Sequence, residues 1–269
     1  ILALGMADDR NDLAAWMKLA GQGGISLFMF AAGFSVGTML GIELPIWVNL
    51  PATLCWFVLA VNAFNLIDGM DGACCGIGII SALGLSAVTL YLGQPGASLV
   101  FLALAGACLG FLRYNFHPAS IFLGDSGSML IGFVLAAGSL QIRSQHSAVL
   151  MLLLPLLSVG IPVFDVIVAV WRRAARKVLA KILQDPVACR IFGPDLDHLH
   201  HKLIQSGMTQ RKAAMVLYGF AIVACLLAFL SIAMASLRLA FLTAGVMLLI
   251  HVASRQILRN ELRLSSEVL

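Results

Sequence analysis

The chain has 269 residues, of which 61% are hydrophobic and only 11% are charged. Soluble domains carry about 25% charged residues, so this composition excludes a soluble protein and indicates a polytopic membrane protein. The net charge of +4 is small, and where the charges lie is more informative than their sum.

The chain opens with a short apolar stub at residues 1–7, followed directly by the charged run D-D-R-N-D at residues 8–12. A stub of this length before an acidic pair is typical of the end of a helix whose start is absent. We therefore expect one or more membrane spans upstream. The first loop is expected to cover about residues 8–22, and Lys18 lies within it.

The apolar runs that follow predict about eight complete crossings, each of the length that a bilayer requires. They are expected at about 23–41, 46–67, 74–92, 97–113, 128–142, 148–171, 213–236 and 239–257. The predicted fold class is all-α: one membrane domain over residues 1–269, built as a polytopic helical bundle. Cytoplasmic loops are expected at about 8–22, 62–73, 113–128 and 172–212.

The basic residues give the predicted orientation. Alternation of the spans places all of the 17 lysines and arginines except Arg143 and Arg238 on one side. By the positive-inside rule this side is cytoplasmic. Most aspartates fall on the same side, although the rule does not require carboxylates there.

The six cysteines lie mostly inside apolar runs, and none has C-x-x-C spacing. We interpret them as small core residues rather than a disulfide framework or a zinc site. The adjacent Cys74 and Cys75 leave a redox pair as the weaker alternative.

The most informative stretch is N-A-F-N-L-I-D-G-M-D-G at residues 62–72, at the end of an expected span. Asn62, Asn65 and Asp68 recur every three residues, which on a helix places them within one face about 120° wide. The glycines beside Asp68 and Asp71 let the backbone leave the helix. Carboxylates and amides at a membrane helix end are costly and indicate a ligand. The alternative is a polar helix end with a glycine turn.

Two further acidic groups accompany this stretch. Asp8 and Asp9 are adjacent, and neighbouring carboxylates repel each other unless a cation or a proton intervenes. Oxygen ligands suit a hard cation such as Mg²⁺, which is held by one or two carboxylates, water and substrate phosphates. A solvated acidic loop is the alternative.

Asp125 lies in G-D-S-G-S, residues 124–128, which opens an expected span. Ser126 or Ser128 can cap the free amides of this helix start, which also form a phosphate cradle. A simple N-cap explains the pattern alone, but beside the other acids Asp125 becomes a candidate metal ligand.

The third cluster is D-L-D-H-L-H-H at residues 195–201. Imidazoles can donate to phosphate oxygens or carry a charge near pH 7, and we favour phosphate recognition. Zinc binding and a structural role are the alternatives.

Four patterns now stand in order on one membrane side: residues 8–12, residues 62–72, N-F-H-P-A-S-I-F-L-G-D-S-G-S at 115–128, and D-H-L-H-H-K-L at 197–203. Together they resemble the polyprenyl-phosphate N-acetylhexosamine-1-phosphate transferases. That family includes bacterial undecaprenyl-phosphate N-acetylglucosamine-1-phosphate transferases and, more distantly, the phospho-N-acetylmuramoyl-pentapeptide transferases. The resemblance covers nearly the whole chain. It implies about eleven spans, of which this sequence would lack about the first two.

The resemblance implies a reaction in which a UDP-N-acetylhexosamine and undecaprenyl phosphate give the lipid-diphosphate sugar and UMP. It implies Mg²⁺ as cofactor, with Mn²⁺ as the alternative. The implied partners are the two substrates and the lipid bilayer, with a homodimer left open and no nucleic acid. The implied location is the bacterial inner membrane, with the active site on the cytoplasmic face.

Roles for individual residues follow from the same resemblance. It implies Asp125 as the main metal ligand, with Asp9 and Asp68 beside it. The expected catalytic residues are Asp8, Asp9, Asp68 and Asp71, and the expected substrate-binding residues are Asn62, Asn65, Lys18, His198, His200 and His201. A phosphate monoester has a second pKa near 6 and is mostly dianionic at pH 7. We therefore expect Asp8 to orient or contact the metal first and to remove a proton second.

One departure from the family pattern concerns the phosphates. Leu196 stands where close relatives usually have Arg, which grips phosphates with two donors. Lys202, Arg190 or Lys212 could substitute for it, and without a substitute, donor affinity or activity comes into question. An inactive homologue is one alternative interpretation. A cation-coupled transporter is the rival from another class, but transport sites lie near the bilayer midplane.

Overall fold

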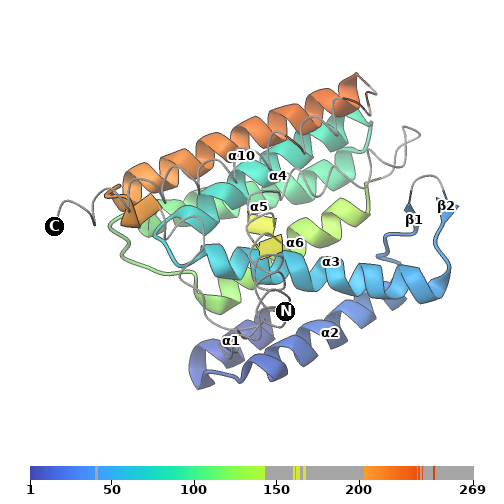
Figure 1. Cartoon of the computed structure of the whole chain (residues 1–269), viewed down its shortest axis with the longest axis horizontal. Coiled ribbons are helices and arrows are strands. Elements are labelled where there is room, and N and C mark those ends of the chain that lie inside the picture. The colour runs from blue at the N-terminus through green and yellow to red at the C-terminus, as the bar shows by residue number, and fades with distance from the viewer. Residues whose placement is uncertain are drawn as a thin grey trace, which may run out of the picture.

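The computed structural model describes residues 1–39, 42–142 and 203–234, and the single positions Gly160, Pro162, Val163, Val166, Ile167, Ser236, Arg238 and Gly245. Its main elements are helices α1 (Leu2–Asn11), α2 (Ala15–Ala31), α3 (Ile46–Ile67), α4 (Ala73–Tyr91), α5 (Pro95–Asn115), α6 (Gly124–Leu140) and α10 (Gln210–Ala233), and strands β1 (Thr38–Met39) and β2 (Ile42–Glu43). The helices form one bundle (Figure 1).

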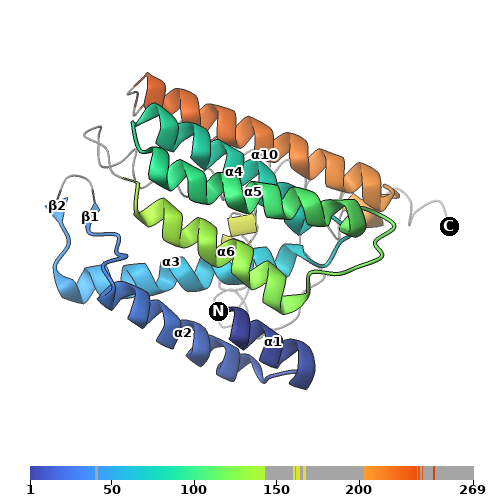
Figure 2. The same ribbon diagram turned by 180° about the vertical axis from the view of Figure 1, so that it is seen from behind.

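The bundle is layered. Helix α10 packs on α4, and α4 packs on α5; α3 packs on α6; α1 lies against α6, and α2 lies against α3. Seen from behind, α10, α4 and α5 again lie together on one side, with α1 and α2 on the other (Figure 2). The centre is filled by large apolar side chains that are almost fully buried, including Phe57, Phe64, Leu85, Phe101 and Leu217.

Four of the described helices, α3, α4, α5 and α10, are long and apolar enough to cross a membrane, and α6 is a shorter apolar helix. Their bounds lie close to the expected runs, so the prediction of an all-α membrane bundle is confirmed for the described part of the chain. The spans expected at 148–171 and 239–257 lie outside the described residues, apart from a few single positions.

The span expected at 23–41 is wrong in position. The helix there, α2, occupies Ala15–Ala31 and therefore includes Lys18, so most of the loop expected at 8–22 is helical. Gly33 adopts a left-handed φ of 91° and ends the helix, although apolar residues continue beyond it. The chain then forms the short antiparallel hairpin of β1 and β2, which the sequence did not predict.

Three of the predicted core cysteines, Cys74, Cys75 and Cys108, are buried with free thiols, and Cys225 is also buried. Cys55 is exposed on α3. The interpretation as core residues is confirmed for the four buried cysteines.

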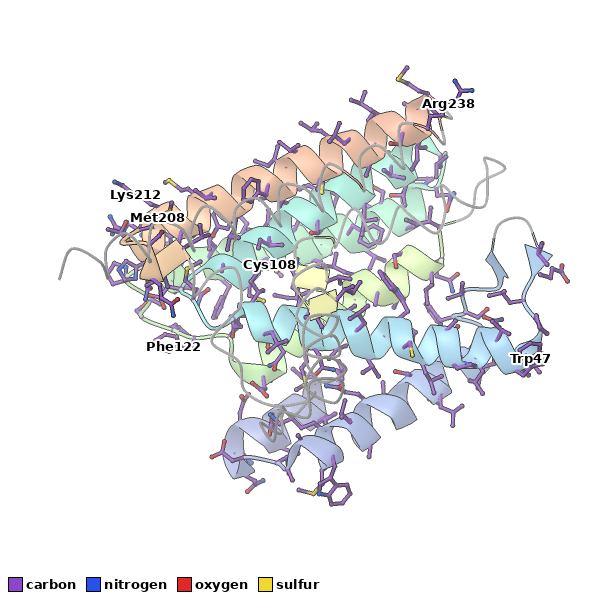
Figure 3. The ribbon with its side chains drawn as sticks, in the orientation of Figure 1. Trp47, Cys108, Phe122, Met208, Lys212 and Arg238 are labelled. Carbon is purple, nitrogen blue, oxygen red and sulfur yellow. The ribbon has the colours of Figure 1, made fainter. Side chains whose placement is uncertain are left out.

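The two ends of the bundle differ. Figure 3 shows Phe122, Met208 and Lys212 at one end and Trp47 and Arg238 at the other. The first end contains the start of α10 and the connection between α5 and α6. It also carries the polar groups described next.

Candidate functional site

The start of α6 is capped by a carboxylate from another helix. Asp9, on α1, accepts hydrogen bonds from the amides of Asp125 (Asp9 Oδ1 to N, 2.7 Å) and Ser126 (Asp9 Oδ2 to N, 3.2 Å). A negative group is stabilised at a helix N-terminus by the free amides and the helix dipole. Gly124 makes the contact possible: its φ is 64°, and a Cβ there would lie 2.8 Å from Asp9 Oδ1.

This cap differs from the expected one. Ser128 donates to the carbonyl oxygen of Gly124 (2.9 Å) and caps no amide. The amides of residues 125 and 126 are thus occupied by Asp9, and they form no open phosphate cradle here.

Lys18 of α2 joins two of the acids. Its ammonium group pairs with Asp8 and donates to Asp125 Oδ2 at 3.0 Å. Asp8 is only 3% exposed, and its second oxygen accepts from the amide of Leu13 at 2.8 Å. A carboxylate this buried needs such partners, because an isolated buried charge is very costly.

Asp68 follows the last residue of α3, next to the same cluster. Burial raises its pKa from the usual 3.8 to about 7, and the negative charges of Asp125 and Asp9 add to the shift. Close carboxylates cannot all ionise without cost. The cluster of Asp8, Asp9, Asp68, Asp125 and Lys18, here called the acid–lysine cluster, therefore carries an excess of negative charge.

The two asparagines of α3 contact different neighbours. Asn62 donates to Gln22 Oε1 on α2 at 2.6 Å and to its own helix at Val58 O at 2.7 Å. Asn65 donates to Ser128 Oγ on α6 at 3.1 Å. The predicted polar face of α3 therefore lies between α2 and α6.

Asp71 is bonded to the connection between α5 and α6. Its Oδ2 lies 2.7 Å from His117 Nδ1 and accepts from the amide of Ala119 at 3.1 Å. His117 is itself tied to α10, because its carbonyl oxygen accepts from Arg211 Nε at 2.8 Å.

The next residue, Gly72, forms hydrogen bonds through both its amide and its carbonyl oxygen. Its amide donates to Asn115 Oδ1 at 3.2 Å, and its carbonyl oxygen accepts from the hydroxyl of Tyr218 at 2.6 Å. Gly72 has a φ of 74°, which favours glycine, and α4 begins directly after it.

The structure thus brings together Asp8, Asp9, Lys18, Asp68 and Asp125, and Asn65 also forms a side-chain hydrogen bond with Asp125. The contacts shown for Asp71 and Asn62 are with neighbouring elements at the same end. The predicted residues His198, His200 and His201, and the departure at Leu196, lie outside the described residues.

Among the described residues, no group of three or more His, Cys, Asp or Glu side chains is arranged to hold a metal ion. The chemistry of the donor set nevertheless fits a hard divalent cation. The donors are carboxylate oxygens that outnumber the one lysine among them, and the charges of Asp125 and Asp9 add to the effect of burial in raising the pKa of Asp68.

The sequence did not predict the contacts that Gln22, Ser128, His117 and Tyr218 make in this site. Gln22 and His117 each stand in a polar stretch at the expected cytoplasmic side, which is a usable signal. Ser128 and Tyr218 lie in apolar helices, and their roles depend on how the helices pack.

The known proteins that this chain resembles in sequence are named as transferases. The chain is 34% identical over 227 residues to a Bacillus subtilis protein described as a probable undecaprenyl-phosphate N-acetylglucosaminyl 1-phosphate transferase, covering 81% of this chain and 59% of the relative. It is 36% identical over 244 residues to the decaprenyl-phosphate N-acetylglucosaminephosphotransferase of Mycobacterium tuberculosis, covering 81% and 58%. It is 32% identical over 229 residues to a phospho-N-acetylmuramoyl-pentapeptide-transferase of Moorella thermoacetica, covering 80% and 65%.

The matched region therefore spans less than two thirds of each of these relatives. The family model for glycosyl transferase family 4 matches residues 1–143, which is more than half of the chain and includes the whole acid–lysine cluster. The chain belongs to glycosyl transferase family 4.

Proposed function

We propose that this protein transfers an N-acetylhexosamine 1-phosphate from its UDP-sugar to undecaprenyl phosphate and releases UMP. N-Acetylglucosamine is the favoured sugar, because the Bacillus and Mycobacterium relatives are named for it. The product would initiate synthesis of a cell-envelope glycan. The observation that carries this proposal is the acid–lysine cluster at one end of the membrane bundle.

The place of the cluster fits chemistry on a lipid head group. Asp9 lies near the end of α1, Asp68 directly follows α3, and Asp125 is the second residue of α6. A cation-coupled transporter would hold its carboxylates midway along the spans. A head-group phosphate stays at the membrane surface, where helix ends can reach it.

The reaction brings a phosphate anion against a diphosphate, so it depends mainly on positioning and charge neutralisation. Lys18 is 29% exposed and offers an ammonium group to an incoming phosphate oxygen. Asp8 holds Lys18 in place and is itself fixed by the amide of Leu13. A dianionic acceptor phosphate needs little help in losing a proton, so we assign Asp8 first to orientation.

Asp125, Asp68 and Asp9 would hold Mg²⁺ or Mn²⁺. When bound, the ion would supply positive charge to the diphosphate as the bond to UMP breaks. In this arrangement Asp9 has a second task, because its carboxylate also caps α6. Asn65 braces the same helix start through Ser128.

We further propose that the cluster faces the cytoplasm of a bacterial inner membrane. Arg10, Lys18, Arg113, Arg211 and Lys212 all lie on the helix ends or turns of this end, as the positive-inside rule requires of the cytoplasmic side. UDP-sugars are made in the cytoplasm, which agrees with this orientation.

The direct test uses membranes that contain the protein at its natural full length, radiolabelled UDP-N-acetylglucosamine and undecaprenyl phosphate. We expect label in the lipid fraction with Mg²⁺ and none with EDTA. Asp125→Asn should lower the transfer rate by about a hundredfold or more, the scale of losing one electrostatic contact to the reacting groups.

Glu43→Gln is the matched control, since Glu43 is an exposed acid on the β1–β2 hairpin and belongs to none of the four patterns. It should transfer at the wild-type rate. A wild-type protein that transfers no label from any UDP-N-acetylhexosamine would refute the proposed reaction.

A further inference from the structure

Helix α10 reaches the turn between α3 and α4 through two residues on one of its faces. Arg211 and Tyr218 are two helical turns apart, so they project on the same side of the helix. The Tyr218 hydroxyl donates to the carbonyl oxygen of Gly72 at 2.6 Å. Arg211 Nε donates to the carbonyl oxygen of His117 at 2.8 Å.

Both contacts are made to residues that neighbour Asp71. Gly72 is the next residue in the chain, and His117 Nδ1 lies 2.7 Å from the Asp71 carboxylate. The Ala119 amide donates to the same carboxylate oxygen at 3.1 Å. Helix α10 thus holds both the backbone that carries Asp71 and the loop that grips its side chain.

The ring of Tyr218 packs against α4 at Gly76. A Cβ added at Gly76 would lie 2.1 Å from two ring carbons of Tyr218, so only glycine leaves room there. Close packing of this kind fixes the ring and with it the direction of the hydroxyl. The hydrogen bond to Gly72 is therefore directed by packing and does not depend on a mobile side chain.

Helix α10 lies outside residues 1–143, the part matched by the family model, so the match assigns nothing to it. We infer that Tyr218, supported by Arg211, is a positioning residue for Asp71: it holds the turn at residues 68–72 in the geometry that the nucleotide-sugar donor requires. This inference rests on the proposed function and adds to it that Asp71, one of the expected catalytic residues, serves the nucleotide-sugar donor.

The kinetic test is Tyr218→Phe, which removes the hydroxyl and keeps the ring. We expect the KM for the UDP-sugar to rise, so that kcat/KM for it falls about tenfold, the effect of one lost hydrogen bond of average strength. The KM for undecaprenyl phosphate should not change, because Tyr218 contacts no part of the acid–lysine cluster. A general structural defect would lower the active fraction and leave both KM values unaltered.

The matched control is Tyr91→Phe. Tyr91 also links α4 and α10 by a hydroxyl bond to a main-chain oxygen, Ala233 O at 3.4 Å, but at the opposite end of the two helices. This variant should keep wild-type values of kcat and of both KM constants.

The second measurement needs no activity: hydrogen–deuterium exchange of the peptide that covers residues 68–73. Tyr218→Phe should speed amide exchange there, and Tyr91→Phe should not. Equal exchange in wild type and Tyr218→Phe would overturn the inference, as would faster exchange with unchanged donor kinetics. If the wild-type protein shows no transfer, the proposed function fails with the catalytic part of the inference, and exchange still decides whether α10 holds the turn.

Discussion

Lys18 neutralises a carboxylate that cannot reach water. Asp8 is 3% exposed, whereas Lys18 is 29% exposed and also contacts Asp125. The ion pair therefore has one buried and one accessible partner. Such a pair is valuable less for its attraction than for preventing an unpaired buried charge.

Lys18→Met should accordingly destabilise the protein. We expect the free energy of unfolding at pH 7 to fall by about 2 kcal/mol, the scale for a lost hydrogen bond to a charged group. Adding Asp8→Asn should recover part of the loss, because the double variant has no unpaired charge. Denaturant unfolding in detergent measures both, with Lys18→Arg as the charge-preserving control. A single variant as stable as the wild type would contradict this account of Asp8.

Asp68 should make the stability depend on pH. Burial, and then the charges of Asp125 and Asp9, raise its pKa from 3.8 to about 7. Between these values the folded state binds more protons than the unfolded chain, so the free energy of unfolding falls as pH rises, and it levels off above about pH 7.

This prediction is checked by unfolding temperatures in EDTA at about pH 5.5 and about pH 8, where the group is mainly protonated and mainly ionised. The drop between the two should be smaller in Asp68→Asn than in the wild type, since the amide does not titrate. Equal drops in the two proteins would show that Asp68 titrates as it does in water.

At this scale the sequence predicted the acids better than their partners. Asp8, Asp9, Asp68 and Asp125 could be recognised because carboxylates at membrane helix ends are costly. Their contacts could not, since the side of a helix that meets a given neighbour depends on packing. Asn62 and Asn65 share the predicted face, yet one meets α2 and the other meets α6.

Helix packing in this bundle depends on glycines at a few contacts. Gly76 of α4 leaves room for Tyr218, and Gly84, two turns further on, lies against Cys225 of α10. Gly5 does the same for α1, because a Cβ there would lie 2.4 Å from Ser126 Cα. Small residues let membrane helices approach closely, and close packing is the main source of their association.

Gly76→Ala should therefore separate α4 from α10. The new methyl group cannot coexist with the Tyr218 ring, so we expect a loss of about 1–3 kcal/mol, as for other overpacked cores. The donor kinetics should change in the direction of Tyr218→Phe. Gly110→Ala on α5 is the control, since nothing lies within 4 Å of its added Cβ. Thermal unfolding ranks the variants, and equal stability of the two would refute the packing argument.

Element boundaries show where sequence patterns mislead. The runs at 46–67 and 74–92 became α3 and α4 almost unchanged, because their polar ends and glycines coincide with the helix ends. The run at 23–41 did not become a helix of those bounds. Its apolar composition continues past Gly33, but the left-handed backbone there stops α2, and hydropathy alone does not register a turn.

The two ends of the whole molecule carry different features. The acid–lysine cluster lies where α1 and α3 end and α6 begins, and Arg211 contacts the α5–α6 connection from the start of α10. Figure 3 shows Lys212, at the start of α10, at one end of the bundle and Arg238 at the other, and Figure 1 shows the β1–β2 hairpin at the end opposite to the start of α10. The sequence predicted this division through the positions of its basic residues.

Cysteine labelling tests the orientation in intact cells. In a background with Cys55 and Cys189 replaced by Ala, Glu43→Cys on the hairpin should react with a membrane-impermeant maleimide added outside. Lys212→Cys at the start of α10 should react only after the cells are opened. Reversed labelling of the two positions would place the cluster on the outer face and contradict the use of a cytoplasmic donor.

The Asp9 cap has a consequence for how this end of the protein attracts phosphate. Because an internal carboxylate fills the first amides of α6, the described part of the cluster itself offers phosphate only the ammonium of Lys18, a point charge at a partly hydrated surface. Mobile ions screen such a charge over roughly 10 Å at 0.1 M. Substrate capture in the proposed reaction should therefore weaken with ionic strength, unlike capture by a rigid amide nest.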